Sequence, residues 1–381
     1  MTSVPPARIG ALCALVLCGQ LAGCDGAKHD APAPSPAPAS PLPARSAARS
    51  LPALQQARLE YLFEAGALLA RAWPKLSGER PCLLLVDPAT QWLVGCERAP
   101  SADFAQQAER VRGRPVYARA STRLTVAGLD VATQQWLERA AASARVEPRQ
   151  AHAPDAGEPR LVLVGTLEAV RAARHDFRDC MTEEWVSVAL HELMHVWQLS
   201  APAFAGELRA IAAGTLAPDA IRALFVQDPS YRALVEREYG LLVDAAAGSP
   251  ERADARRALQ RWRPRYAARR AYLAARPNGE QLVRADRVFT YLEGVARYVE
   301  SRFLIDPVLR PALPVRGDAD FRGFTRYASG DYAAMQNRQL DAEYDYALGF
   351  HLALLLDRAD PTWKDRVHAQ PGHLIGLVET L

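Results

Sequence analysis

The chain has 381 residues, of which 49% are hydrophobic and 23% are charged, a composition typical of soluble globular proteins. This length is sufficient for one large domain or two modest ones with a substantial core. The formal net charge of +3 is too small to indicate a nucleic-acid partner, and we expect none.

The N-terminus has the pattern of an export signal. Arg8 provides a short positive region, and the mostly apolar run 9–21 leads to small residues before Cys24. The run is shorter than the roughly 20 apolar residues that a membrane-spanning helix needs. The tetrapeptide at 21–24, LAGC, resembles the lipobox of bacterial lipoproteins. The resemblance implies a lipid on Cys24 that anchors the protein in the cell envelope, facing the periplasm, on either the inner or the outer membrane. An ordinary secretory signal is the alternative.

Composition divides the chain into four segments. A signal peptide covers 1–23, and a tether rich in Pro and Ala covers 24–50. Such a tether is extended and cannot bury a core, so it spaces the body of the protein from the membrane. We expect an N-terminal α/β subdomain over 51–200 and a helical C-terminal subdomain over 201–381.

Apolar patterning predicts mixed helix and strand in the first half. A helix is expected near 52–73, followed by a β-hairpin over 82–96. Two further strands are expected at 115–120 and 160–166, with a helix near 130–145 between them.

The hairpin brings two cysteines together. If the turn of the hairpin is at 88–90, Asp87 faces Gln91 and Cys82 lies opposite Cys96. Facing residues on antiparallel strands lie about 4.5–5.5 Å apart at Cα, within reach of a disulfide. We therefore expect a disulfide here, the alternative being two buried thiols that pack as small hydrophobic groups.

Beyond about residue 180, apolar residues recur at helical spacing. Pro264 is expected to break one of the helices, because proline lacks the amide hydrogen that the helix interior uses. The predicted fold class is therefore α+β, with a mixed N-terminal half and a mostly helical C-terminal half. The predicted helices cover 182–200, 205–226, 231–247, 251–275, 280–304 and 339–357.

The strongest chemical pattern is the pentapeptide HELMH at 191–195, inside a predicted helix for which Thr182 is the expected N-cap. Residues four apart lie on one helix face about 6 Å apart, so His191 and His195 can reach one Zn²⁺ at about 2.0–2.1 Å. Glu192 is adjacent to that face and can take a proton from a water that the metal activates. The alternative is two surface histidines, but the surrounding apolar residues predict burial, and buried His and Glu need partners.

A third ligand must come from elsewhere, because no histidine follows His195 until His351. A later predicted helix offers Glu293 and Glu300, which are seven residues apart and therefore lie on one face.

Three blocks of sequence carry a resemblance to a known family. HELMHVWQ at 191–198 and LEGVARYVE at 292–300 resemble the gluzincin group of zinc metallopeptidases, in particular the peptidase-MA-like families. YALGFHLALLLD at 346–357 is similar to their closing helix. The resemblance implies a zincin-like fold and one zinc ion per chain. It also implies that Glu293, the glutamate before the glycine, is the third zinc ligand.

The chain departs from the family in one respect. Ninety-seven residues separate His195 from Glu293, many more than is usual there. The excess forms an insertion at about 201–280, which is a candidate subdomain for restricting substrates. The long spacing also leaves Glu207 and Glu300 as rival ligands.

These patterns predict zinc-dependent hydrolysis of a peptide or protein substrate, with Glu192 as the general base. One alternative is a non-catalytic, zincin-like envelope lipoprotein that acts as a binding or assembly factor, although metal binding alone does not require Glu192. Another is a zinc hydrolase that acts on a different amide. The oxyanion also needs a stabilising group, and the candidates are Tyr298, Tyr344, Tyr346 and His351.

Overall fold

The structure is a computed structural model. The predicted signal peptide, nearly all of the tether and the helix expected near 130–145 lie outside the residues it describes. The described residues are 49–76, 82–96, 104–120, 161–173, 178–212, 220–327, 340, 343–370 and 372–381.

The described strands form one mixed sheet in the order β3-β4-β2-β1-β5. β1 pairs antiparallel with β2 and parallel with β5, and β2 also pairs antiparallel with β4, so the hairpin and both later strands are confirmed. β3 was not expected, because Val111 is its only buried residue, which leaves no apolar alternation to detect. The strands are β1 (Cys82–Val86), β2 (Thr90–Val94), β3 (Ala105–Val111), β4 (Arg114–Ala120) and β5 (Leu161–Gly165).

The inner strands β1 and β2 are buried on both faces of the sheet. Side chains alternate along β1, so Leu83 and Leu85 join the main core while Cys82 and Leu84 point the other way. The second face carries a small separate apolar cluster that also contains Phe104. The sheet therefore presents its larger apolar face to the helices.

The predicted disulfide is confirmed and lies in this second cluster. It joins Cys82 to Cys96, with their Cα atoms 4.8 Å apart. Cys96 lies beyond the end of β2, and the preceding residue, Gly95, has a φ of 84°. Glycine adopts this conformation without steric cost, so the chain can turn there and bring Cys96 back to its partner.

The hairpin register is shifted by one residue from the expected register. Val86 pairs with Gln91, and the amide of Asp87 donates to the carbonyl of Thr90 at 2.9 Å, so the turn has two residues rather than three. The Asp87 carboxylate also accepts a hydrogen bond from the amide of Ala89 at 3.0 Å. This side-chain bond stabilises the tighter turn, and apolar patterning does not reveal it.

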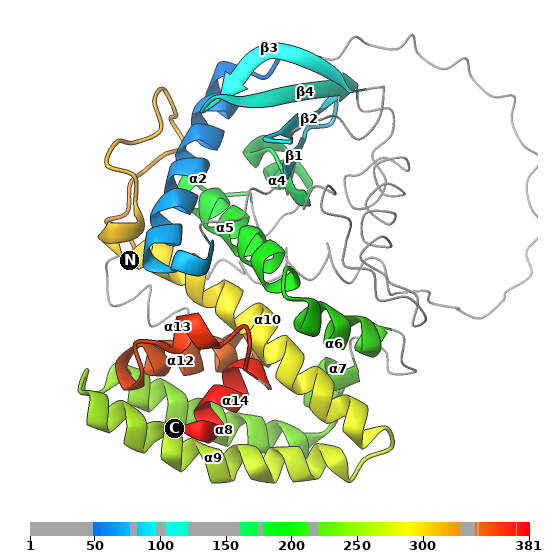
Figure 1. Cartoon of the computed structure of the whole chain (residues 1–381), viewed down its shortest axis with the longest axis vertical. Helices are drawn as coiled ribbons and strands as arrows, with labels where there is room; N and C mark the ends of the chain where they lie inside the picture. Colours follow the sequence, from blue (N-terminus) through cyan, green and yellow to red (C-terminus); the bar gives the residue numbers. More distant parts are fainter. Residues whose placement is uncertain are drawn as a thin grey trace, which may run out of the picture.

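The central helix, α5 (Thr182–Leu199), packs against α2 (Ala53–Ala72) and the sheet (Figure 1). The indole nitrogen of Trp185 donates to the carbonyl of Gly165 at the end of β5, at 2.8 Å, which joins the helix to the sheet. The helices expected near 52–73 and over 182–200 are therefore both present, and both pack against the sheet.

The N-cap of α5 differs from the prediction by one residue. Thr182 is already helical, and its hydroxyl donates to Asp318 at 2.6 Å. The N-cap is Met181, whose amide donates to the carboxylate of Glu184 at 2.8 Å. Glu184 thereby satisfies one of the free amides at the start of the helix.

The C-terminal half is a helical layer built around α10 (Gly279–Ile305), which crosses α5 and packs along α12 (Tyr344–Ala359) (Figure 1). α8 (Pro229–Ala247) and α9 (Arg252–Ala274) pack on α12, so the insertion is part of this helical layer. The single helix expected over 205–226 is two helices, and 213–219 between them are not described. The remaining helices are α4 (Leu167–Ala173), α6 (Pro202–Ala212), α7 (Ala220–Gln227), α13 (Trp363–Arg366) and α14 (His373–Thr380), with 3-10 turns at Pro74–Leu76 and Pro307–Leu309.

The predicted break at Pro264 is wrong, because α9 continues through it. Pro264 is exposed, whereas Leu259, Trp262 and Tyr266 are buried at helical spacing on the opposite face. A missing amide on the solvent side costs less than it would in the interior, and packing of the aromatic residues holds the helix together across it.

The predicted α+β fold class is confirmed: a mixed sheet with helices lies in the N-terminal part, and helices dominate the C-terminal part. The boundary at residue 200 between two subdomains stays a prediction. Within the described ranges, no helix is both long and apolar enough to cross a membrane.

Candidate metal centre

The crossing of α5 and α10 brings together His191, His195 and Glu293, all of them buried. One ligand atom from each residue lies within 4.8 Å of the other two. Oε2 of Glu293 is 3.4 Å from Nε2 of His191 and 3.5 Å from Nε2 of His195. Residues nearly 100 positions apart in sequence therefore present three ligand atoms to one point.

These distances fit a metal ion better than they fit hydrogen bonds. Two ligand atoms bound at 2.0–2.1 Å in tetrahedral geometry are about 3.3 Å apart, close to the separations observed here. Hydrogen bonds between nitrogen and oxygen are normally shorter, at about 2.9 Å. Nε2 of His195 and Oε2 of Glu293 are buried, and neither makes a hydrogen bond within the described part of the chain. Such buried polar atoms are costly unless a ligand satisfies them, and a divalent cation would do so.

The other ring nitrogen of His191 faces Glu300. Oε2 of Glu300 is 3.4 Å from Nδ1 of His191, and its Oε1 accepts a hydrogen bond from Arg297 at 2.6 Å. Glu300 therefore lies on the opposite side of the imidazole from Glu293. This is the usual place for a carboxylate that orients a ligating histidine. Of the two glutamates, Glu293 therefore faces the Nε2 atoms of both histidines, whereas Glu300 faces Nδ1 of His191.

His195 is held by Gln198, which the sequence did not single out. Nδ1 of His195 is 2.9 Å from Oε1 of Gln198, and the amide nitrogen of Gln198 donates to the carbonyls of Tyr291 and Leu292 at 2.9 and 3.1 Å. Because the Gln198 oxygen can only accept, Nδ1 of His195 must donate, which leaves the lone pair on Nε2 for a metal. The carbonyl partners directly precede Glu293, so Gln198 also fixes α5 to α10 at the site.

Electrostatics keep both glutamates ionised. Burial by itself would raise the pKa of Glu293, but His195 and His191 in their protonated forms outweigh burial and hold that pKa below its ordinary value. A divalent cation bound to the neutral imidazoles would supply the same positive charge. Burial also opposes ionisation of Glu300, yet Arg297 and His191 lower its pKa. Two buried carboxylates around two imidazoles give the site the negative charge that a divalent cation requires.

The remaining acidic candidates differ in position. Glu192 follows His191 on α5 and is half-buried. Glu207, on α6, has Oε2 3.3 Å from Nε2 of His373 and does not belong to the group of three ligands. The rival assignment of Glu207 as a ligand therefore has no geometric support.

Among the four candidates for stabilising an oxyanion, Tyr346 is the one that contacts the centre. Its ring stacks on that of His191, with centroids 5.9 Å apart and an angle of 23° between the planes. Tyr298, Tyr344 and His351 instead hydrogen-bond to Asp357, Asp286 and the carbonyl of Ala347, respectively.

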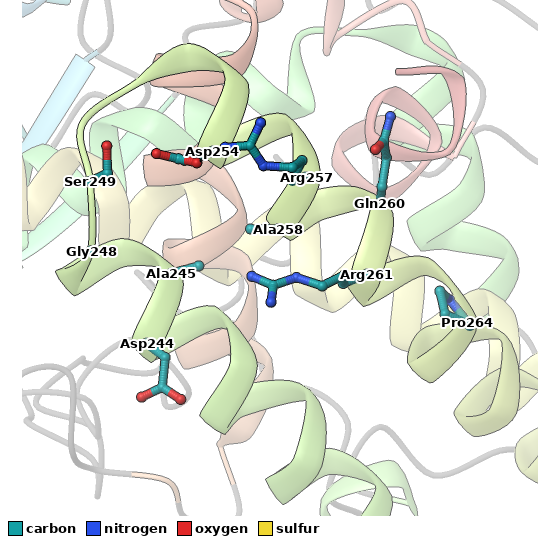
Figure 2. Close-up of a pocket in the computed structure, with 10 residues that line it drawn as sticks. All are labelled: Asp244, Ala245, Gly248, Ser249, Asp254, Arg257, Ala258, Gln260, Arg261 and Pro264. Atoms are coloured by element: carbon teal, nitrogen blue, oxygen red, sulfur yellow. Dashed lines mark hydrogen bonds and ion pairs between the residues drawn. The ribbon is translucent and has the colours of Figure 1, made fainter.

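A groove of 780 Å³ lies between α8 and α9 (Figure 2). Its charged lining includes Asp254 and Arg257, which form an ion pair with each other. None of its lining residues belongs to the group of His191, His195 and Glu293.

Comparison with family models, with curated proteins and with solved structures found no match to this chain. The resemblance to gluzincins therefore depends on the three sequence blocks and on the geometry of the centre. The described residues form a buried His-His-Glu group that can hold a metal ion.

Proposed function

We propose that the protein is a zinc-dependent hydrolase of peptide bonds. One observation carries the proposal: two histidines one turn apart on α5 and a glutamate from α10 converge within 4.8 Å in a buried site. Two histidine nitrogens and one carboxylate oxygen are a ligand set typical of catalytic zinc, in which a water takes the fourth position. Glu192, next to the first histidine, adds the carboxylate that hydrolysis needs and simple metal binding does not.

The roles of the residues follow from their positions. His191, His195 and Glu293 would hold the ion, which when bound supplies a Lewis acid that lowers the pKa of water and polarises the substrate carbonyl. Glu192 would accept the proton of the attacking water and then deliver it to the leaving amine. Glu300 and Gln198 keep the imidazoles oriented through their Nδ1 atoms.

Tyr346 is the best-placed residue to stabilise the oxyanion. Its ring lies against His191, whereas the other three candidates bond elsewhere. A phenol at this position can donate a hydrogen bond to the oxygen on which charge develops.

The proposed location follows from the N-terminus. We place the protein in the cell envelope, anchored through a lipid on Cys24 and facing the periplasm, where it would meet peptide or protein substrates. Metabolic labelling with a tagged fatty acid, comparing the wild type with Cys24→Ser, tests the anchor. A labelled Cys24→Ser variant would refute it.

The function is tested by zinc content and by turnover of an unstructured protein such as casein. We expect one zinc per chain in the wild type and in Glu192→Gln, with cleavage lost in Glu192→Gln alone. Glu207→Gln is a matched control, because it makes the same substitution at a carboxylate outside the centre. Zinc without Glu192-dependent cleavage of any peptide or other amide would instead favour a binding or assembly factor.

A further inference from the structure

The insertion contributes a charged residue beside the metal centre. Arg222 lies on α7, and its side chain is only 16% exposed. Its Nη2 donates to Oδ2 of Asp345 at 3.2 Å, and its Nη1 lies 3.6 Å from Oε1 of Glu343. Its guanidinium carbon is 5.7 Å from the centroid of the Tyr346 ring. Arg222 thus contacts three of the four residues from 343 to 346, at the start of α12.

The residues that Arg222 contacts include one that packs against the metal centre. Asp345 and Tyr346 are consecutive in the first turn of α12, and the Tyr346 ring stacks on His191 at 5.9 Å. Asp345 is buried, and an unpaired buried carboxylate would be strongly disfavoured, so its pairing with Arg222 fixes this turn of the backbone.

The guanidinium also stays charged in this position. Burial alone would lower the pKa of Arg222, but Asp345 and Tyr346, and more weakly Glu293, raise it above its ordinary value. A planar guanidinium can pair with a carboxylate and lie over an aromatic ring at the same time, which a lysine ammonium does less well.

We propose that Arg222 is a positioning residue that holds Tyr346 against His191, so that the insertion completes the catalytic site. The inference deepens the proposed function and depends on it for the role of Tyr346. Arg222 acts on Tyr346 rather than on substrate, because Asp345 and Glu343 already face its two terminal nitrogens.

The first test is independent of catalysis. In the zinc-loaded protein labelled with ¹³C at histidine Cε1, the His191 resonance is identified by its loss in His191→Ala. Stacking of an aromatic ring shifts this resonance, so Tyr346→Ala defines the unstacked position. We expect Arg222→Gln to move the resonance toward that position and Arg222→Lys to move it less. Arg237→Gln, an exposed arginine on α8, should leave it unchanged. An unmoved resonance in a folded Arg222→Gln would overturn the proposal.

The second test uses kinetics and a double-mutant cycle. We expect Arg222→Gln to keep one zinc per chain, to leave KM within about twofold and to lower kcat about 10- to 100-fold. In a Tyr346→Phe background, the same substitution should change kcat less than about threefold, because the hydroxyl that Arg222 is proposed to position is no longer present.

The outcomes separate the competing explanations. A rise in KM at constant kcat would assign Arg222 to substrate binding, and an equal loss in the Tyr346→Phe background would show that it acts independently of Tyr346. Either result refutes the positioning role. If the wild type cleaves no peptide but the histidine resonance still responds to Arg222→Gln, the proposed function fails while the positioning of Tyr346 stands.

Discussion

Gly294 of α10 and Gly349 of α12 face each other where the two helices cross. A Cβ atom on Gly294 would lie 2.2 Å from the Cα atom of Gly349, and one on Gly349 would lie 2.1 Å from the carbonyl oxygen of Thr290. No side chain fits between backbones at these distances. Glu293 adjoins one glycine and Tyr346 precedes the other by three residues, so this contact sets how Glu293 and Tyr346 lie relative to each other.

Replacing Gly294 by alanine should therefore damage both stability and the metal centre. The added methyl group overlaps backbone atoms, so α10 and α12 must separate, at a cost of about 3 kcal/mol or more. Glu293 moves with α10, and we expect zinc affinity to fall at least tenfold. Denaturant unfolding and competitive zinc titration measure the two effects.

Gly240→Ala on α8 is the matched control for this substitution. Nothing lies within 4 Å of a Cβ at Gly240, so alanine there should be neutral or should stabilise the helix by about 1 kcal/mol. Equal behaviour of the two variants would contradict the close packing at Gly294.

Comparing Glu300→Gln with Glu293→Ala tests which glutamate binds the metal and which one supports His191. Because Glu300 faces Nδ1 of His191, its loss should weaken zinc binding about 10- to 100-fold while one zinc per chain is still bound at saturation. Glu293→Ala should instead abolish stoichiometric zinc. Glu280→Gln, at an exposed position on the same helix, serves as the control. The reverse order of the two effects would make Glu300 the ligand.

Burial of His351 should make the stability of the fold depend on pH. Burial lowers its pKa from 6.5 to about 4. Between these values the unfolded chain binds a proton that the folded chain does not, so stability falls as pH drops from 6.5 toward 4. The contribution amounts to about 3 kcal/mol across this window.

The measurement is the free energy of unfolding of the wild type and of His351→Gln at pH 7 and pH 4. Glutamine can still donate to the carbonyl of Ala347, which His351 Nδ1 contacts at 2.7 Å, but it does not titrate. The difference between the two proteins should change by about 3 kcal/mol in favour of the variant at pH 4. A constant difference would show that His351 titrates normally.

The Cys82–Cys96 disulfide should stabilise the protein without affecting the metal centre. It closes a loop with a sequence separation of 14 and lies in the apolar cluster on the sheet face away from the main core. Replacing both cysteines by serine should lower the free energy of unfolding by about 3 kcal/mol and leave zinc content unchanged. Two free thiols in non-reducing mass mapping of the wild type would remove the basis of this prediction.

Local patterns predicted most of the regular elements, and each failure has a physical cause. The helix that becomes α5 and the hairpin of β1 and β2 were evident from apolar spacing. The hairpin register was wrong by one residue, because the Asp87 side chain stabilises a two-residue turn. Pro264 did not break α9, because a buried face of aromatic residues outweighs one missing amide on the solvent side.

The candidate site was predictable in part. The spacing of His191 and His195 placed both on one helix face, because helical geometry is set by sequence separation alone. Glu293 was proposed as a ligand by resemblance, and the long insertion left Glu207 and Glu300 as rivals. Gln198 could have been noticed, since a residue three positions after His195 lies near the same face.

By itself, the sequence determined which residues can bind metal and that two of them share one face of a helix, because both properties are local. The tertiary structure decided that Glu293, and not Glu300, meets the Nε2 atoms, and that Tyr346 is the tyrosine against His191. Both depend on the angle and closeness at which α5, α10 and α12 cross. Contacts between residues far apart in the chain set that crossing, above all the backbone contact between Gly294 and Gly349, and no local pattern encodes it.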